Sequence, residues 1–227
     1  MQLDLMECSN LKCIPESIGN CQSLQFLSLG GTRVFEELPE SLGSCKELTV
    51  LDLYRCRNLK CLPESIGGCV NLVEVNMRGC KVVKELPESF VQLKKLRILS
   101  LYKCIGLQFL PENIDELLSL EELSINKCKI LSHLPDRIGY LPNLAFLDMA
   151  RCKGIKSLPE SFGQLCKLKW LDLEKCKNLD SIPECVGNLD NLKYVNLLKC
   201  LKLKHIPDCM LALISEGIVV NYSLQTV

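Results

Sequence analysis

The chain has 227 residues, of which 48% are hydrophobic, 27 acidic and 27 basic, and it therefore carries no formal net charge at pH 7. This composition provides enough apolar side chains for a sizeable core. It argues against nucleic-acid binding as the main function, because such proteins usually have a large basic excess. The first residues contain no apolar run of signal-peptide length, and the longest apolar run, 209–214, is too short to cross a bilayer. We therefore expect a soluble protein without membrane contact.

A proline recurs every 24 residues, and it ends nine successive repeats at Pro15, Pro39, Pro63, Pro87, Pro111, Pro135, Pro159, Pro183 and Pro207. Ahead of the proline, the period that begins at Leu48 places apolar residues at Leu48, Leu51, Leu53, Cys56, Leu59 and Leu62. The period and the L-x-x-L-x-L-x-x-C pattern are those of a leucine-rich repeat. Because no insertion interrupts the nine periods, the chain is predicted to be one repetitive domain.

Each part of the period predicts one element. In residues 51–53, two leucines flank an aspartate, which predicts a short strand with the leucines inward and the aspartate outward. The proline is predicted to take the first position of a helical turn, followed by an acidic residue at the positive end of that turn. Four residues after the proline, six repeats carry a glycine, which we expect to provide a left-handed exit from the turn: Gly19, Gly43, Gly67, Gly139, Gly163 and Gly187.

The predicted fold is an α/β leucine-rich-repeat solenoid, or horseshoe, that spans residues 1–227 as one domain. Its parallel β-sheet forms the concave face, and short helical or 3-10 turns form the convex side. Residues 208–227 are interpreted as a degenerate tenth coil that closes the stack. In this segment Leu213, Val219 and Leu224 continue the inward register, whereas Glu216 and Asn221 stand where leucines belong.

Most of the 16 cysteines follow the repeat, which indicates packing rather than chemistry. One repeat position holds Cys8, Cys56, Cys80, Cys104, Cys128, Cys152, Cys176 and Cys200, with Thr32 in the second repeat. Cys21, Cys45 and Cys69 take an inward position that is leucine in later repeats. We interpret these residues as small buried hydrophobes with reduced thiols, which favours a reducing, cytoplasmic compartment.

Signals for catalysis, cofactors and metals are absent from the sequence. There is no P-loop, no dinucleotide-binding fingerprint, no H-E-x-x-H motif and no C-x-x-C pair. The two histidines, His133 and His205, lie on outward positions far apart in the chain and are interpreted as surface residues. The protein is therefore predicted not to be an enzyme and to need no cofactor or metal.

Outward strand positions are free of the core pattern and can carry function. The row through Asp52 is small and polar and is interpreted as scaffold. A basic row and several aromatic residues lie beside it, and Arg and aromatic side chains are common anchors of protein interfaces. The candidate partner-binding residues are Tyr54, Arg55, Tyr102, Lys103, Lys127, Phe146, Arg151, Trp170, Lys175, Tyr194 and Lys199. An acidic protein surface is the favoured partner; the alternative is that the lysines are only solvated and Trp170 only covers a leucine.

Stretches such as LTVLDLYRCRNLKCLPESIGGC resemble the leucine-rich-repeat region of plant intracellular immune receptors of the nucleotide-binding type. This resemblance implies a module that senses a pathogen effector or a guarded host protein and holds its own nucleotide-binding domain inactive. The chain contains no nucleotide-binding domain, and MQLDL begins inside a predicted strand, so the chain is interpreted as an excised fragment or a truncated product. The alternative is a free-standing intracellular scaffold similar to Ras-group leucine-rich-repeat proteins.

Overall fold

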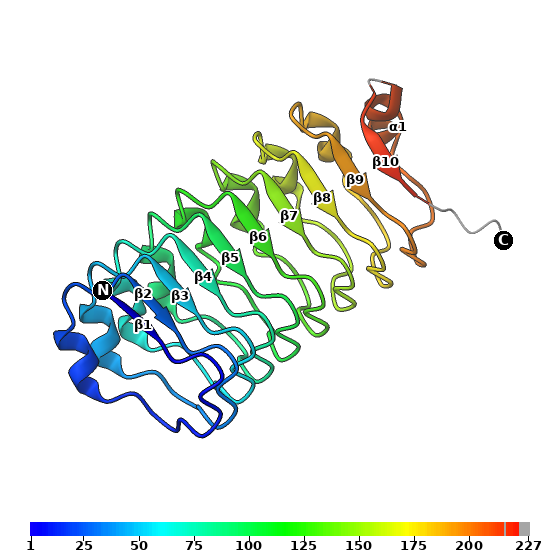
Figure 1. Ribbon diagram of the computed structural model, residues 1–227. Helices are drawn as coiled ribbons and strands as arrows, with labels where there is room; N and C mark the ends of the chain where they lie inside the picture. The colour runs from blue at the N-terminus through cyan, green and yellow to red at the C-terminus, as the bar shows by residue number, and fades with distance from the viewer. Residues whose placement is uncertain (216, 223–227) are drawn as a thin grey trace.

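The computed structural model describes residues 1–215 and 217–222, which form one parallel sheet with helical turns behind it (Figure 1). Each strand pairs with the next one along the chain, in the order β1 to β10. The strands are β1 Gln2–Asp4, β2 Phe26–Ser28, β3 Val50–Asp52, β4 Glu74–Asn76, β5 Ile98–Ser100, β6 Glu122–Ser124, β7 Phe146–Asp148, β8 Trp170–Asp172, β9 Tyr194–Asn196 and β10 Val219–Asn221. From β1 to β9 the partners are 24 residues apart, as with Leu27 opposite Leu51, so the predicted solenoid is confirmed.

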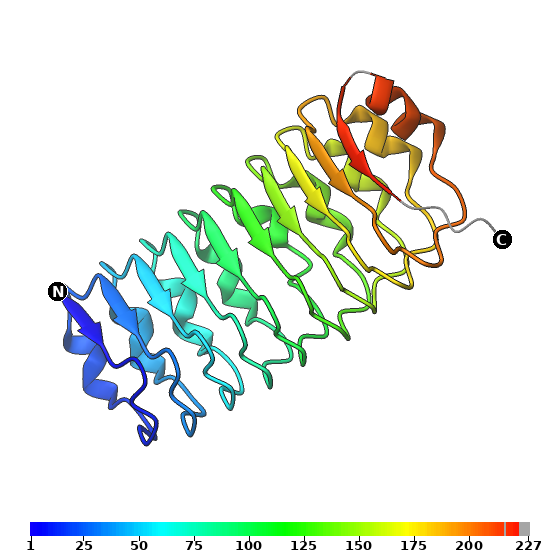
Figure 2. The ribbon, with the colours of Figure 1, turned by 45° about the vertical axis from the view of Figure 1, so that its right-hand side comes forward.

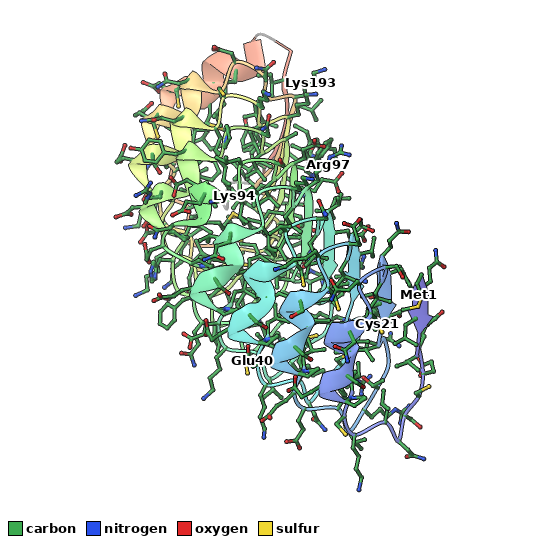
Figure 3. The ribbon with its side chains drawn as sticks, turned by 90° about the vertical axis from the view of Figure 1, so that its left-hand side faces the viewer. Met1, Cys21, Glu40, Lys94, Arg97 and Lys193 are labelled. Atoms are coloured by element: carbon green, nitrogen blue, oxygen red, sulfur yellow. The ribbon has the colours of Figure 1, made fainter. Side chains whose placement is uncertain are left out.

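The convex side consists of eight 3-10 turns and one α-helix in the described residues (Figure 2). These are η1 Glu16–Asn20, η2 Glu40–Ser44, η3 Glu64–Gly68, η4 Glu88–Gln92, η5 Ile114–Glu116, η6 Asp136–Tyr140, η7 Glu160–Gln164, η8 Glu184–Asn188 and α1 Asp208–Ser215. Figure 3 looks along the solenoid: Met1, Arg97 and Lys193, which precede β1, β5 and β9, lie along one edge, while Glu40 lies on the side of the turns.

The proline precedes the helical turn and does not occupy its first position. Pro15 has an extended backbone, with φ −70° and ψ 154°, and η1 begins at the next residue. The prediction about proline was therefore wrong by one position. The physical reason is that the Pro15 carbonyl accepts the first hydrogen bond of the turn, from the Ile18 N–H at 3.0 Å, so proline serves as the cap.

The repeat glycines serve close packing between coils, not a left-handed exit, and this prediction was also wrong. In the described residues, positive φ among glycines is confined to Gly31, Gly79 and Gly217. A Cβ built on Gly139 would lie 1.8 Å from the carbonyl oxygen of Ser161 in the next coil. Such a contact is far inside van der Waals distance, so glycine lets successive turns stack closely.

Three of the nine repeats lack this glycine: the last has Leu211, in α1, and the other two are central repeats in which the stacking changes. Val91 takes the glycine position in η4 and is almost fully buried. The following turn, η5, has only three residues and begins at Ile114. Asp115 takes the glycine position in η5, and the Arg137 guanidinium of the next coil donates two hydrogen bonds to its carboxylate, at 2.8 and 2.6 Å. In the central coils, the close contact at glycine is thus replaced first by the buried side chain of Val91 and then by the ion pair between Asp115 and Arg137.

The core is a stack of leucines, with Phe35, Phe90 and Phe162 as its largest fully buried side chains. None of the 16 cysteines forms a disulfide. Seven of the cysteines in the main row are buried: Cys56, Cys80, Cys104, Cys128, Cys152, Cys176 and Cys200. Cys8 is exposed and Cys21 is half-buried, contrary to the prediction, because both lie in the first coil, where no preceding coil covers them.

The buried thiols also donate hydrogen bonds, which the sequence analysis did not anticipate. Each of the seven buried thiols of the main row donates to the carbonyl 27 residues earlier, as from Cys104 Sγ to Met77 O at 3.1 Å and from Cys152 Sγ to Ile125 O at 3.0 Å. Burial raises the pKa of Cys104 and of Cys152 to about 12. The thiols are therefore neutral donors that link each coil to the one before it.

The tenth coil differs from the others in its register. Leu213 is buried, but Val220 rather than Val219 pairs with Val195, and Val219 is exposed. The prediction that Val219 points inward was wrong because an α-helix stands here in place of a 3-10 turn. An α-helix advances less per residue, so the same distance needs more residues. Glu216 and Leu224 lie outside the described residues.

Candidate functional site

The sheet face is hollowed by a groove of about 780 Å³ above β4 to β8. Most of its lining comes from outward strand positions, which alternate with the buried leucines, and from the residues that follow the strands. It combines acidic, basic and aromatic side chains, among them Glu74, Arg78, Tyr102, Glu122, Phe146 and Trp170. The structure thus brings Tyr102, Phe146 and Trp170 of the candidate set to one surface.

Tyr102 is the centre of a cationic cluster at this groove. Arg78, Lys103 and Lys127 hold their charged groups 5.0, 5.1 and 4.8 Å from the centre of its ring. Lys127 Nζ also donates a hydrogen bond of 2.7 Å to the phenol oxygen, and this contact lowers the pKa of Tyr102. Cation–π contacts at exposed positions stabilise by roughly 0.5–1 kcal/mol, so the ring is held in place with its cations.

The Trp170 and Tyr194 rings stack on each other on adjacent strands. Their ring centres are 3.7 Å apart and the planes differ by 15°. Trp170 is 40% exposed and Phe146, on the preceding strand, is 45% exposed. The Tyr194 hydroxyl accepts a hydrogen bond from Asn221 Nδ2 at 3.1 Å. The aromatic side chains therefore present an ordered apolar surface to solvent.

The polar row through Asp52 has a structural role, as interpreted from the sequence. Asp52 Oδ1 accepts hydrogen bonds from the Tyr54 N–H at 3.0 Å and from Asn76 Nδ2 at 2.8 Å. Asp172 repeats the first of these contacts, with the Glu174 N–H at 2.8 Å. Partial burial raises the pKa of Asp172. These carboxylates hold the turn that follows each strand.

The basic row lies on those turns and faces a different groove. This second groove has a volume of about 500 Å³ and is lined by Lys127, Lys129, Arg151, Lys153, Lys175, Lys177, Lys199 and Leu201. Lys129, Lys153 and Lys177 were not among the residues predicted from the sequence, because they lie beyond the rows next to the strands. Their spacing of 24 residues was the signal that could have revealed them.

The candidate set therefore divides between two surfaces. Four of its cations line the turn groove, and Tyr102, Phe146 and Trp170 line the sheet groove. Tyr54 and Arg55 line neither groove; they contact each other, with the guanidinium 4.8 Å from the ring centre.

The described residues contain no group of three or more His, Cys, Asp or Glu side chains that could hold a metal ion. His133 is exposed and lies beside Phe109, with 5.8 Å between the ring centres. Within the same described residues, no helix is long and apolar enough to span a membrane.

Fold and surface together define a leucine-rich-repeat solenoid. The Leucine Rich Repeat family model matches residues 47–69 and 167–189. A comparison with curated proteins gives no sequence match.

Among solved structures, the chain is similar to the leucine-rich repeat domain of the type III effector XopL, at 27% identity and a TM-score of 0.87. That alignment covers 99% of this chain and 77% of the other.

Two receptor complexes share the fold at lower identity. The plant peptide hormone receptor RGFR1 in complex with RGF2 is 21% identical, with a TM-score of 0.50, over 99% of this chain and 49% of the receptor. The Toll–Spatzle complex of Drosophila is also 21% identical, with a TM-score of 0.68, over 95% of this chain and 28% of that chain. This chain therefore spans half or less of each of these receptors.

Proposed function

We propose that the protein is a recognition module that binds a partner protein on the sheet face. The observation that carries this proposal is a row of aromatic side chains on three adjacent strands, in which Phe146 and Trp170 are exposed and Tyr194 is half-buried. Aromatic side chains bury a large area on binding and lose few rotamers. Since the Trp170 ring already stacks on Tyr194, it loses little conformational entropy when a partner covers it.

The charges of the sheet groove favour a protein partner with mixed polarity. Glu74 and Glu122 line the same groove as Arg78 and as Tyr102 with its surrounding cations. A partner with complementary charges would fix its register there while the aromatic rings supply contact area. The two receptor complexes with the same fold support a role in protein recognition.

We further propose that this recognition module is the sensing and autoinhibitory leucine-rich-repeat region of a plant intracellular immune receptor, acting in the cytoplasm. Its partners would be a pathogen effector, a guarded host protein or the receptor's own nucleotide-binding domain. The repeat pattern and the ladder of free, buried thiols support this proposal. The alternative, a free-standing intracellular scaffold, is supported by the similarity to a domain of an effector, not of a receptor.

The binding proposal is tested with a matched pair of variants. W170A/Y194A removes the stacked aromatic pair, and Y140A removes an exposed aromatic residue on the convex side. Cross-linking in extract of the source organism, followed by mass spectrometry, identifies proteins bound to the wild type. We expect W170A/Y194A to lose them and Y140A to retain them, with circular dichroism showing that both variants fold. Retention of every partner by W170A/Y194A would refute the sheet-face site.

The receptor proposal is tested by sequencing the complete transcript. A P-loop-containing nucleotide-binding domain in frame ahead of Met1 is expected for an immune receptor. A reading frame without such a domain would refute the receptor and favour the scaffold.

A further inference from the structure

The groove on the turns, at the carboxyl ends of the strands, collects seven cations from four successive coils. Three coils contribute two cations each, with a first row of Lys127, Arg151 and Lys175 and a second row of Lys129, Lys153 and Lys177; Lys199 comes from the fourth coil. No acidic side chain lines this groove. A chain with equal numbers of acidic and basic residues thus concentrates positive charge on one short stretch of its rim.

Little of this charge is neutralised within the protein. Glu174 is the one carboxylate in the described residues within 4 Å of these cations, at 2.5 Å from Lys175 Nζ and 3.9 Å from Arg151 Nε. The second row, Lys129, Lys153 and Lys177, makes no ion pair in the described part of the chain, and all three side chains are exposed. Several like charges around one hollow surface repel one another, and a bound anion would relieve that repulsion.

The first row is retained at a cost to the backbone. Lys127, Arg151, Lys175 and Lys199 have φ between 60° and 65°, in the left-handed region that favours glycine. Gly31 and Gly79 fill the same repeat position in the N-terminal half, so the fold accepts glycine there. A left-handed non-glycine residue costs roughly 1–2 kcal/mol. Glu7, Arg55 and Lys103 share this conformation, so the left-handed turn belongs to the repeat, and in the last four of the nine repeats it carries cations without exception.

From these three observations we propose that the turn groove binds an acidic linear segment of a partner protein. The cations span four coils spaced by about 4.8 Å, or roughly 14 Å, which matches about four residues of extended chain at about 3.3 Å each. Leu201 closes one end of the groove and the neighbouring Leu198 is also exposed. The segment therefore consists of aspartate or glutamate residues with an apolar residue at the end nearest Leu201.

A nucleic acid fits the groove less well than an acidic peptide does. The basic surface ends within four coils, and the coils also carry acidic residues at η7 and η8, Glu160 and Glu184. A nucleic-acid footprint requires a longer basic surface and a strongly basic domain, whereas the sequence pI is about 6.7. The two grooves adjoin at Lys127, whose Nζ donates to the Tyr102 hydroxyl. Lys153 and Lys177 line the turn groove and Trp170 lines the sheet groove, so substitutions at these residues change one groove at a time.

The test uses a charge reversal and a control at the same repeat position. K153E/K177E inverts two groove cations, while R57E/K81E makes the same change in the N-terminal coils, where both side chains are exposed and lie outside the groove. The probe is a fluorescein-labelled peptide of about four glutamates followed by leucine. Fluorescence polarisation measures its binding to the full chain, beside a peptide with glutamine in place of glutamate and a single-stranded RNA of equal charge.

We expect K153E/K177E to weaken peptide binding at least tenfold and R57E/K81E to change it less than twofold. Binding of the glutamate peptide should weaken as salt is raised, since exposed charges are screened, and the glutamine peptide should bind at least tenfold more weakly. Equal loss in both variants, no binding of the glutamate peptide, or tighter binding of the RNA would overturn the proposal. W170A/Y194A reports on the sheet groove separately, since it leaves the turn groove intact.

Discussion

The hydrogen bond from each buried thiol makes a prediction that separates two roles of cysteine. Cys104 is fully buried, and its Sγ donates to Met77 O, which also accepts a bond from the Cys80 N–H. Alanine in place of Cys104 removes both the apolar sulfur and the donor. The burial term is about 1 kcal/mol, the cavity adds to it, and the lost hydrogen bond contributes about 0.5–1 kcal/mol. We expect C104A to lower the free energy of unfolding by about 2 kcal/mol.

Serine in place of Cys104 keeps a donor of similar position but loses apolar volume. Thr32 is the precedent: it occupies the same repeat position, is fully buried, and its hydroxyl donates to Leu29 O at 2.8 Å. We therefore expect C104S to be more stable than C104A by about 0.5–1 kcal/mol.

Urea unfolding followed by far-UV circular dichroism provides the free energies, and fluorescence of Trp170 reports on the C-terminal coils separately, because a solenoid does not always unfold in one step. If C104A proves more stable than C104S, burial alone explains the cysteine row and the hydrogen-bond argument fails.

Four further predictions concern the repeat glycine, the left-handed turn residue, the buried aspartate and the cysteines. G139A should lower the free energy of unfolding by more than 2 kcal/mol in urea titration, since its Cβ would meet the next coil's backbone; an unchanged midpoint would contradict the close-packing role. K199G should raise stability by roughly 0.5–1 kcal/mol, because the exposed Lys199 has φ 62°, and a loss would contradict the strain argument. D172N should be more stable than the wild type at pH 7, because burial raises the pKa of the Asp172 carboxyl and its ionisation therefore destabilises the folded state. The difference in stability should vanish as the pH falls below 3.8, the ordinary pKa of aspartate, where the carboxyl is protonated in both states. A thiol reagent at pH 8 should label the four exposed cysteines of the native chain fastest and the buried ones only after unfolding. Burial raises the pKa of Cys152 to about 12, so rapid labelling of Cys152 in the native chain would contradict the buried, neutral state of these thiols.

Sequence alone was sufficient to predict the solenoid because every coil repeats the same physical problem. The leucines at Leu51 and Leu53 must face inward for a three-residue strand to bury anything, and the spacing of the prolines prevents any change of register between coils. The small polar row through Asp52 was also predictable as scaffold, because a uniform row next to the core has no freedom to vary. These features depend on local pattern and strict period.

The tertiary structure alone decided how neighbouring coils touch. That Gly139 admits Ser161, that Asp115 substitutes for a glycine by pairing with Arg137, and that Cys104 bonds to Met77 all depend on the offset between stacked coils. This offset is set by the packing of side chains between neighbouring coils, and it cannot be read from the sequence of a single repeat.

The candidate site shows the same division. The sequence pattern predicted aromatic and basic residues on outward rows of the sheet. Because the chain turns sharply after each strand, three of the aromatic residues line the sheet groove and four members of the basic row line the turn groove. The left-handed φ of Lys127 and Lys175 directs the basic row over the rim, where Lys153 and Lys177 join it. Backbone conformation at a single turn residue thus decides which surface a side chain serves, and that conformation is set by the stacked coils together rather than by the residue type alone.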